Sequence, residues 1–278
     1  MKSKWKTSSW IILLILLLGF LLWMVTTKRE PVYNGKTLSE WAQQYGSNHW
    51  SGADRKADAE AEAAIRAIGT NAVPFLLNRL QARESALKRS ARKILPATWH
   101  ARLRLRDDSG NTWRVGAYGF AALGTNAGVV VPQLIEIARN HLEEDGRYVA
   151  VFALRTLGEA AEPAIPFFIE CLTNQTAIIR GDAALGLGSV HRQPEMVLPA
   201  LIHYLQNAET KTSLQNFELT DTLGILGLQF GTEAKAAVPE VLSLLTHADS
   251  YVRESATNCL LRIDAEAAAK AGVERRRD

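Results

Sequence analysis

Histidine and cysteine are the residue types in this chain that most often bind metals or act in catalysis, and both are sparse. Six histidines are scattered over 278 residues, and the two cysteines lie far apart. A zinc site needs ligands at close, defined spacings, such as two histidines one helical turn apart or a Cys-x-x-Cys pair. No such pair occurs, so we expect no metal and no cofactor. Cys171 and Cys259 lie in apolar stretches and should be buried free thiols.

One tripeptide matches the end of a phosphate-binding loop. Gly35-Lys36-Thr37 has the terminal residues of that motif, but the motif requires a further glycine five positions earlier, where Glu30 stands. We therefore expect no nucleotide site. With no nucleophile and base at a recognisable spacing either, the sequence predicts no catalytic residue and no small-molecule substrate.

Charged side chains are the remaining candidates for function, and their distribution is uneven. From Lys28 onward the chain has 29 basic and 29 acidic residues, so its overall charge does not favour a nucleic-acid partner. Residues 83–106 nevertheless carry a net charge of +7, whereas residues 115–264 carry −8. The basic segment is either a solvated helix face or a contact for anionic lipid headgroups. Its candidate contact residues are Arg102, Arg104 and Arg106.

A repeated phrase predicts the elements that position these side chains. A leucine or isoleucine is followed by glycine, a short polar gap, and a proline that begins an apolar run. The phrase occurs at Ile68-Gly69…Pro74, Leu123-Gly124…Pro132, Leu157-Gly158…Pro166, Leu187-Gly188…Pro199 and Leu226-Gly227…Pro239. Glycine ends a helix in the left-handed conformation, and proline fits the first turn of the next. Successive prolines lie 58, 34, 33 and 40 residues apart, which indicates an array of helix-turn-helix repeats.

One of these repeats resembles a known family. The segment His247–Ala256 contains Asp-x-x-Val-Arg-x-x-Ala and is similar to the turn and second helix of a HEAT repeat. Ile179–Ala183 and Trp113–Ala117 are weaker copies, and Tyr148–Ala150 has alanine where the family has arginine. The resemblance implies an all-α, right-handed α-solenoid. It does not identify a function, because HEAT arrays serve many unrelated roles.

The array begins after an apolar N-terminal segment. No charge occurs from Thr7 to Thr27, and these 21 residues match the ~20 that span a bilayer. Trp10 and Trp23 stand near the two ends and Leu17 in the middle, as in a membrane anchor. The alternative is a cleaved signal peptide, although no small-x-small cleavage site follows. The basic residues before the span favour a cytoplasmic N-terminus, which would place the array outside the cytoplasmic membrane, in the periplasm.

The segment between anchor and array has a short predicted helix. Thr37 and Glu40 have the spacing of a capping box, so a helix should begin at Leu38. Its Trp41 and Tyr45 should pack on the first array helices. Residues 31–36 should form a turn, although no β-hairpin is expected. Upstream in the array, residues 57–68, 73–82 and 85–95 each have helical spacing.

The domain map follows from these segments: residues 1–27 as the cytoplasmic tip and transmembrane anchor, 28–52 as a juxtamembrane segment, 53–265 as the array with an insertion at about 96–112, and 266–278 as a charged tail. We expect the second helices to line a concave face. The candidate partner contacts on that face are Arg155, Arg180, Asp182, Arg253 and Glu254.

The expected function is therefore that of a non-catalytic, membrane-anchored scaffold that binds a protein partner. Two alternatives remain open at the level of sequence. One is an enzyme of the bilin-lyase type, a class that also has HEAT-like repeats. The other is a cytoplasm-facing array that binds nucleic acid through residues 83–106, which would show a steep loss of affinity with salt.

Overall fold

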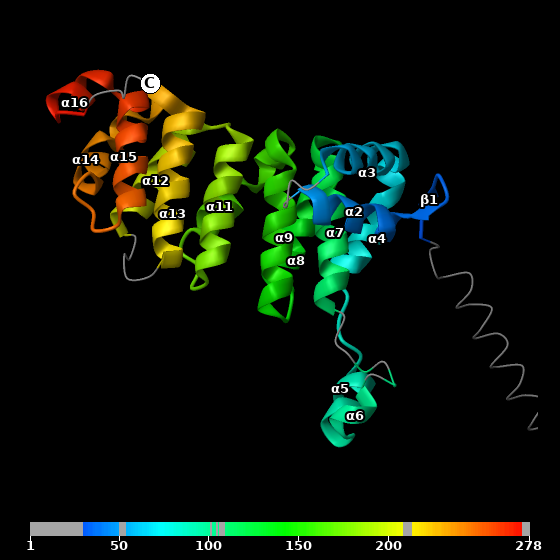
Figure 1. The fold of residues 1–278 in the computed structure, drawn as a ribbon. Helices are drawn as coiled ribbons and strands as arrows, with labels where there is room; N and C mark the ends of the chain where they lie inside the picture. The colour runs from blue at the N-terminus through cyan, green and yellow to red at the C-terminus, as the bar shows by residue number, and fades with distance from the viewer. Residues whose placement is uncertain are drawn as a thin grey trace, which may run out of the picture.

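The computed structural model describes residues 30–49, 54–100, 102–103, 105, 109–207 and 213–273. The predicted anchor residues Trp10, Leu17 and Trp23 lie outside the described residues. Within the described chain the fold is an array of stacked helix pairs, drawn side by side in Figure 1. The predicted all-α helical-repeat fold is confirmed.

Each pair contributes a first helix to one layer and a second helix to the other. The first helices are α4 (Val73–Leu80), α8 (Val131–Asn140), α10 (Ile165–Cys171), α12 (Pro194–Asn207) and α14 (Val238–Leu244). The second helices are α7 (Ser109–Leu123), α9 (Glu144–Thr156), α11 (Ala177–Val190), α13 (Ser213–Gly224) and α15 (Ser250–Ile263). Successive second helices pack directly on one another, whereas successive first helices barely touch. Because helices on the inner side of a curved stack lie closer together, the second-helix layer is the inner one.

The glycine-proline phrase works as predicted at most of the joints between pairs. Gly69, Gly124 and Gly158 each end a helix with φ between 54° and 61°, a backbone region that favours glycine. Each is followed by a 3₁₀ segment: η1 (Gly69–Ala72), η2 (Gly124–Val130) and η3 (Gly158–Ala164). The prolines then stand in the first turns of α4, α8 and α10.

Two joints depart from the phrase. Helix α11 continues through Gly188, and His191 at φ 46° ends it instead. A Cβ on Gly188 would lie 2.9 Å from Ile225, so that glycine serves close helix packing. Gly227 likewise lies inside the π-helical turn η4 (Ile225–Phe230), and Gly231 at φ 52° makes the stop before η5 (Gly231–Ala237).

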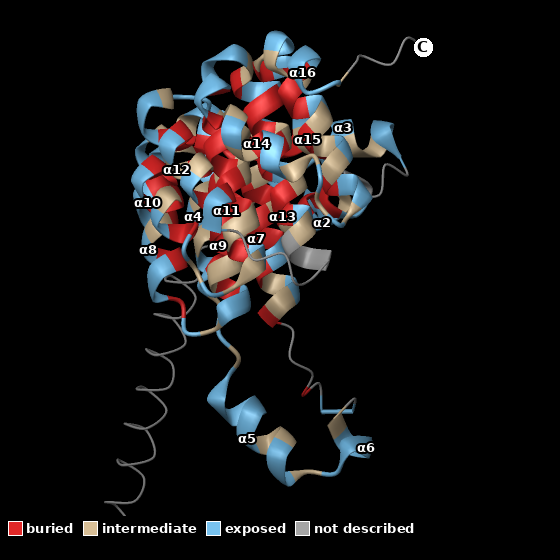
Figure 2. Cartoon of the chain, turned by 90° about the vertical axis from the view of Figure 1, so that its left-hand side faces the viewer, coloured by how far each residue is buried: buried red, intermediate tan, exposed pale blue. Residues whose placement is uncertain are grey.

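The first pair is interrupted by a projecting segment, called the arm below, whose described residues are 81–100, 102, 103 and 105. It contains α5 (Ala86–Ile94) and α6 (Ala97–His100), and it connects α4 to α7. Residues 85–95 do form the expected helix, but it lies in the arm and not in the array, and α7 is the helix that packs on α4. The arm starts before the insertion expected at about 96–112. Figure 2 shows it standing apart from the buried core.

The N-terminal end of the array is covered by α2 (Leu38–His49) and α3 (Arg55–Ile68), which pack on each other and on α7. The predicted capping box is present, since Thr37 N donates to Glu40 Oε2 at 2.7 Å and Glu40 N to Thr37 Oγ1 at 3.3 Å. Trp41 and Tyr45 are buried as expected.

The segment before α2 corrects one expectation. Strands β1 (Val32–Tyr33) and β2 (Lys36–Thr37) form a short antiparallel hairpin, with Tyr33 opposite Lys36. Its turn is Asn34-Gly35, and both residues have positive φ, as a tight hairpin turn requires. At the other end of the chain, α16 (Ala265–Lys270) occupies part of the segment expected to be a charged tail.

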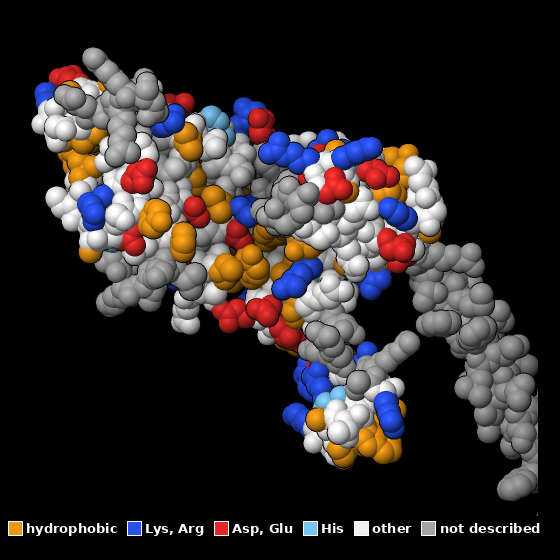
Figure 3. Space-filling model, in the orientation of Figure 1, with side chains coloured by type: hydrophobic (Ala, Val, Ile, Leu, Met, Phe, Trp, Pro, Cys, Tyr) orange, Lys and Arg blue, Asp and Glu red, His pale blue; other side chains and the backbone are white. Residues whose placement is uncertain are grey.

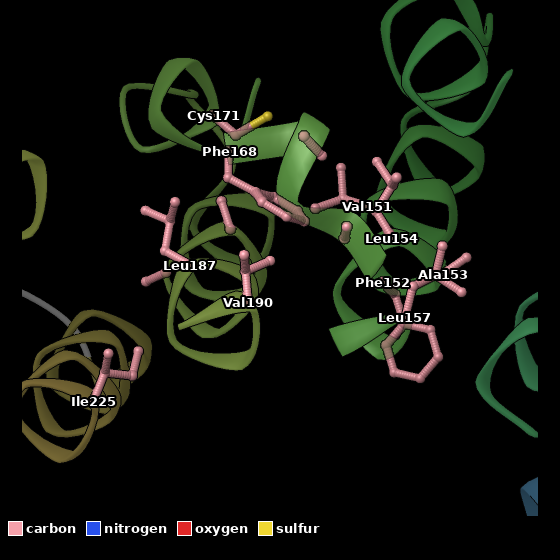
Figure 4. Packing of buried hydrophobic residues seen from close by; sticks show 14 of the residues in the cluster. Val151, Phe152, Ala153, Leu154, Leu157, Phe168, Cys171, Leu187, Val190 and Ile225 are labelled. Carbon is pink, nitrogen blue, oxygen red and sulfur yellow. The ribbon is translucent and has the colours of Figure 1, made fainter. Parts of the chain in front are cut away.

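The core runs without a break between the two layers. Phe168 on α10 is fully buried and points between α9 and α11 (Figure 4). Both cysteines are buried free thiols, as predicted. Burial raises the pKa of each thiol to about 12, so neither is a nucleophile at neutral pH.

One continuous helical run among the described residues, Ser109–Asn140, is long and apolar enough to cross a membrane by length and composition. It consists of α7, η2 and α8, bends at Gly124, and packs on α2, α4 and α9. Those contacts make it a core element of the array.

Candidate surface for a binding partner

The side of the second helices that faces away from the first-helix layer carries aligned aromatic and charged side chains. On α9, Tyr148, Phe152 and Arg155 lie one helical turn apart and share a side of the helix. We call this surface the second-helix face and define it by Tyr118, Tyr148, Phe152, Arg155, Asp182, Phe217, Asp221 and Tyr251. Figure 3 views the array from the side of α9, α11, α13 and α15 and shows hydrophobic and charged groups intermingled.

An ion pair between successive repeats lies at the centre of this face. Arg155 Nε on α9 lies 2.7 Å from Asp182 Oδ1 on α11, and both side chains are largely buried. The Arg155 guanidinium is also 5.0 Å from the centre of the Phe152 ring. The rings of Tyr118 and Tyr148 each lie 6.5 Å from that ring. The result is an aromatic cluster with one charge pair at its edge.

Asp182 is an unusual carboxylate because burial outweighs its salt bridge. Burial raises its pKa to about 6, although Arg155 acts in the opposite direction, and Asp221 adds to the rise. Within the described chain, Asp182 Oδ2 accepts no hydrogen bond. The pKa of Asp221 is also raised, first by its own burial. This centre of the face therefore changes charge under mildly acidic conditions.

The sign of the resulting pH dependence follows from the shift. The pKa of Asp182 is higher in the folded chain, about 6, than its ordinary value of 3.8. The folded state thus binds the proton more tightly, so this contribution to stability is full below about pH 4 and is lost as the pH rises through about 6. Asp182→Asn removes the titration. We expect its stability relative to the wild type to rise by on the order of 1–3 kcal/mol between about pH 4.5 and pH 7.5, since one pKa unit is about 1.4 kcal/mol.

Urea unfolding of both proteins at the two pH values measures this difference. Glu254→Gln is the matched control, because Glu254 is exposed on α15. A stability difference between Asp182→Asn and wild type that stays constant across the pH range would contradict the shifted titration.

Arg180 and Arg253 have structural partners. The Arg180 Nη1 donates to the carbonyls of Asn174 and Gln175 at 2.8 and 3.1 Å, and Arg253 Nη1 donates to His247 and Ala248 in the same way at 2.6 and 2.8 Å. Each arginine therefore holds the turn between its first and second helix. Glu254, beside Arg253, is exposed.

The α8–α9 pair has the same device, in a place the sequence comparison missed. Arg147 Nη1 donates 3.0 Å to the carbonyl of His141, six residues earlier, as Arg180 and Arg253 do. The sequence analysis matched Ala150 to the arginine of the HEAT repeat, and this match is wrong by one helical turn, because Arg147 is the residue that takes that place. The physical reason is visible at Gly146, where a Cβ would lie 2.1 Å from the His141 ring. Glycine replaces the usual apolar residue there and hides the repeat signature.

A second buried charge pair joins α11 to α13. Arg180 Nη2 lies 3.2 Å from Glu218 Oε2, which also accepts a hydrogen bond from the Tyr204 hydroxyl of α12. Burial and that hydrogen bond raise the pKa of Tyr204. The network connects three helices of two consecutive repeats and leaves Arg180 little freedom to bind a partner.

The second-helix face has a groove over α13 and α15. A groove of about 420 Å³ is lined by Asn216, Phe217, Thr220, Asp249, Tyr251 and Ser255. Phe217 is 66% exposed and Tyr251 is 74% exposed. Among the lining residues, Asn216 Nδ2 donates to Asp249 Oδ2 at 2.9 Å, which links α13 to the N-terminal end of α15. The sequence prediction did not include these aromatics, since helical spacing alone does not say which side of a second helix faces solvent.

A larger but more polar groove, about 460 Å³, lies between the α8–α9 and α10–α11 pairs. Its charged walls are already paired, because Arg139 bonds to Glu170 and Thr176 to Glu144. These contacts join neighbouring repeats. Among the described residues, no three His, Cys, Asp or Glu side chains gather where they could hold a metal ion.

The candidate contacts in the arm are only partly described. Arg102 is exposed, and Arg104 and Arg106 lie outside the described residues. The structure thus brings Arg155 and Asp182 together. Arg180 and Arg253 form hydrogen bonds within their own repeats. All four residues lie in the array, whereas Arg102 lies in the arm.

Comparison with known proteins identifies no family. No protein-family model and no curated protein match the chain. A designed armadillo repeat protein covers 82% of this chain and 100% of its own, at 13% identity and a TM-score of 0.43. Two engineered proteins from a structural genomics consortium cover 82% and 84% of this chain, and 96% and 71% of their own, at 16% and 17% identity and TM-scores of 0.40 and 0.42. The helical-repeat fold is therefore established by the packing described above.

Proposed function

We propose that this protein is a non-catalytic, membrane-anchored scaffold whose second-helix face binds a protein partner. The observation that carries the proposal is the groove between α13 and α15, flanked by the exposed Phe217 and Tyr251. Exposed aromatic residues beside arginine are enriched at the centres of protein–protein interfaces. The Arg155–Asp182 pair and the aromatic cluster extend the same surface across the array.

The charge of this face supports a protein partner over a nucleic acid. Residues 115–264, which include this face, carry a net charge of −8, and a nucleic acid would be repelled by that excess of carboxylates. A folded partner with exposed apolar and basic side chains has the complementary chemistry. The HEAT resemblance of residues 247–256 is consistent with binding and adds no specific partner.

The anchor and orientation form part of the same proposal. The uncharged residues 7–27 are expected to span the cytoplasmic membrane with the N-terminus inside, so that the array lies in the periplasm. The partner would then be a periplasmic protein or the outer part of another membrane protein.

Cysteine labelling of the full chain tests both the face and the orientation. Tyr251→Cys places a thiol on the second-helix face, and Glu136→Cys places one on the exposed side of α8 in the other layer. Wild type is the blank, since both native thiols are buried. A membrane-impermeant maleimide added to spheroplasts should label Glu136→Cys at once. It should label Tyr251→Cys only slowly there, but rapidly in the purified protein, because the partner shields that face in the membrane.

Two results would overturn the proposal. Labelling of Glu136→Cys only after lysis would place the array in the cytoplasm. Equally fast labelling of Tyr251→Cys in spheroplasts and in purified protein would leave the second-helix face without a bound partner.

A further inference from the structure

The arm has a feature that the array surface does not explain. Neither α5 nor α6 contains a buried residue, yet the arm exposes Leu87, Ile94, Trp99 and Leu103, the first two at 82% and 80%. Figure 3 shows hydrophobic and basic groups gathered together at the end of the arm. An exposed apolar cluster of this kind marks a contact surface.

The apolar and basic groups lie on opposite sides of α5. Leu87, Ala91 and Ile94 are spaced four and three residues apart and share one side of the helix. Lys88, Arg89, Arg92 and Lys93 occupy the other side. Such a helix lies in a membrane interface, with its apolar side among the acyl chains and its cations at the headgroups. Trp99 adds an indole, which favours the same region.

Part of the positive charge is used to fix the base of the arm. The Glu84 carboxylate, whose side chain is buried, lies 3.1 Å from Arg89 and 2.6 Å from Arg92. Arg89 also approaches Glu143 of the array at 3.6 Å, and Trp113 Nε1 donates to the Ala82 carbonyl at 2.6 Å. The arm is thus held at its root in a projecting position.

The remaining cations are available to a ligand. Arg83, Lys88, Lys93 and Arg102 are exposed, and within the described part of the chain no carboxylate lies within ion-pair distance of them. The arm therefore offers both signals, charge and apolar area, that stable binding at an interface needs.

We infer that the arm is a second membrane contact, which inserts the apolar side of α5 and Trp99 into the headgroup region of an anionic phospholipid bilayer. Charge complementarity supports this occupant: the arm is basic, whereas residues 115–264 carry a net charge of −8 and are repelled by an anionic surface. Insertion would hold the array at a fixed orientation while its acidic body faces away. The arm shares no residue with the second-helix face.

The test measures membrane depth at single positions of the full chain in vesicles. An environment-sensitive fluorophore is attached to Ile94→Cys or, as the matched neighbour on the opposite side of the helix, to Lys93→Cys. The vesicles are phosphatidylcholine with or without about 30% phosphatidylglycerol, which supplies the negative surface potential. We expect brominated lipid to quench the probe at position 94, and not at 93, in anionic vesicles only. At about 1 M salt, where the Debye length is ~3 Å, quenching should fall.

Two variants separate charge from apolar insertion. Lys88→Gln, Lys93→Gln and Arg102→Gln together should lower the ratio of inserted to free arm about 100-fold, since each basic residue contributes roughly fivefold near an anionic surface. Leu87→Ser with Trp99→Ser should abolish quenching at position 94 while the circular dichroism of the array stays unchanged. Equal exposure of positions 93 and 94 to water in every vesicle would overturn the inference. The inference would also be overturned if shielding of the probe at position 94 depended on the density of protein in the vesicles and not on the lipid charge. A second copy of the chain, and not the bilayer, would then cover the apolar side of α5.

Discussion

Replacing Phe168 with alanine should lower the free energy of unfolding by about 3–5 kcal/mol, the range for removing a fully buried phenylalanine. Phe168 is 0% exposed and fills the space between α9, α10 and α11. A repeat array transmits such a loss to its neighbours, because each repeat is stabilised by the next. Urea unfolding of the full chain in mild detergent, followed by circular dichroism, measures the change.

Two further variants make this prediction specific to one contact. Phe217→Ala removes an exposed phenylalanine from the same array and should cost less than about 1 kcal/mol. Gly186→Ala should be costly in the wild type, because its Cβ would lie 2.7 Å from Phe168 Cζ, and well tolerated beside Phe168→Ala. If the effects of Gly186→Ala and Phe168→Ala on the free energy of unfolding were additive, the Phe168 ring would not pack against α11 at Gly186 as described.

The second large effect is expected at Glu218. Glu218→Gln keeps the side-chain volume but leaves the guanidinium of Arg180, which is 17% exposed, without its carboxylate. We expect a loss of about 2–3 kcal/mol, below the full cost of breaking a deeply buried pair because some solvent reaches the site. The same unfolding experiment gives the value.

The comparison is with an exposed ion pair that also joins neighbouring repeats. Glu159 lies 2.6 Å from Arg192, but their side chains are 65% and 53% exposed. Glu159→Gln should cost less than about 1 kcal/mol. Combining Glu218→Gln with Arg180→Met should cost less than the sum of the two single variants, because no unpaired charge then remains, although the turn hydrogen bonds of Arg180 are still lost. A double variant as unstable as the sum of the single ones would assign the effect of Glu218 to something other than this pair.

These effects and the labelling experiments concern separate properties. Phe168 and Glu218 hold the repeats together, whereas Phe217 and Tyr251 are exposed and contribute little to the fold. A variant at the groove that loses its partner while it keeps its stability would therefore support a binding surface. The arm belongs to neither group, since its helices contain no buried residue.

The sequence by itself determined the helices and most of their ends. Glycine stops, prolines in first turns and the Thr37–Glu40 capping box act over a few residues, so they can be read without knowing the rest of the fold. The period of the phrase likewise predicted a helical-repeat array. The same local reasoning failed at Gly146, where a substitution at one position concealed that Arg147 matches Arg180 and Arg253.

Only the tertiary structure decided which side chains meet. Arg155 reaches Asp182, and Arg180 reaches Glu218, across 27 and 38 residues of chain, and each of these contacts depends on how one repeat stacks on the next. The raised pKa of Asp182 follows from the burial that this stacking produces. The helix at residues 86–94 forms locally, but its separation from the array depends on α7 having taken the place beside α4. Local signals fix where a helix begins and ends, whereas its neighbours in space decide which of its sides is buried.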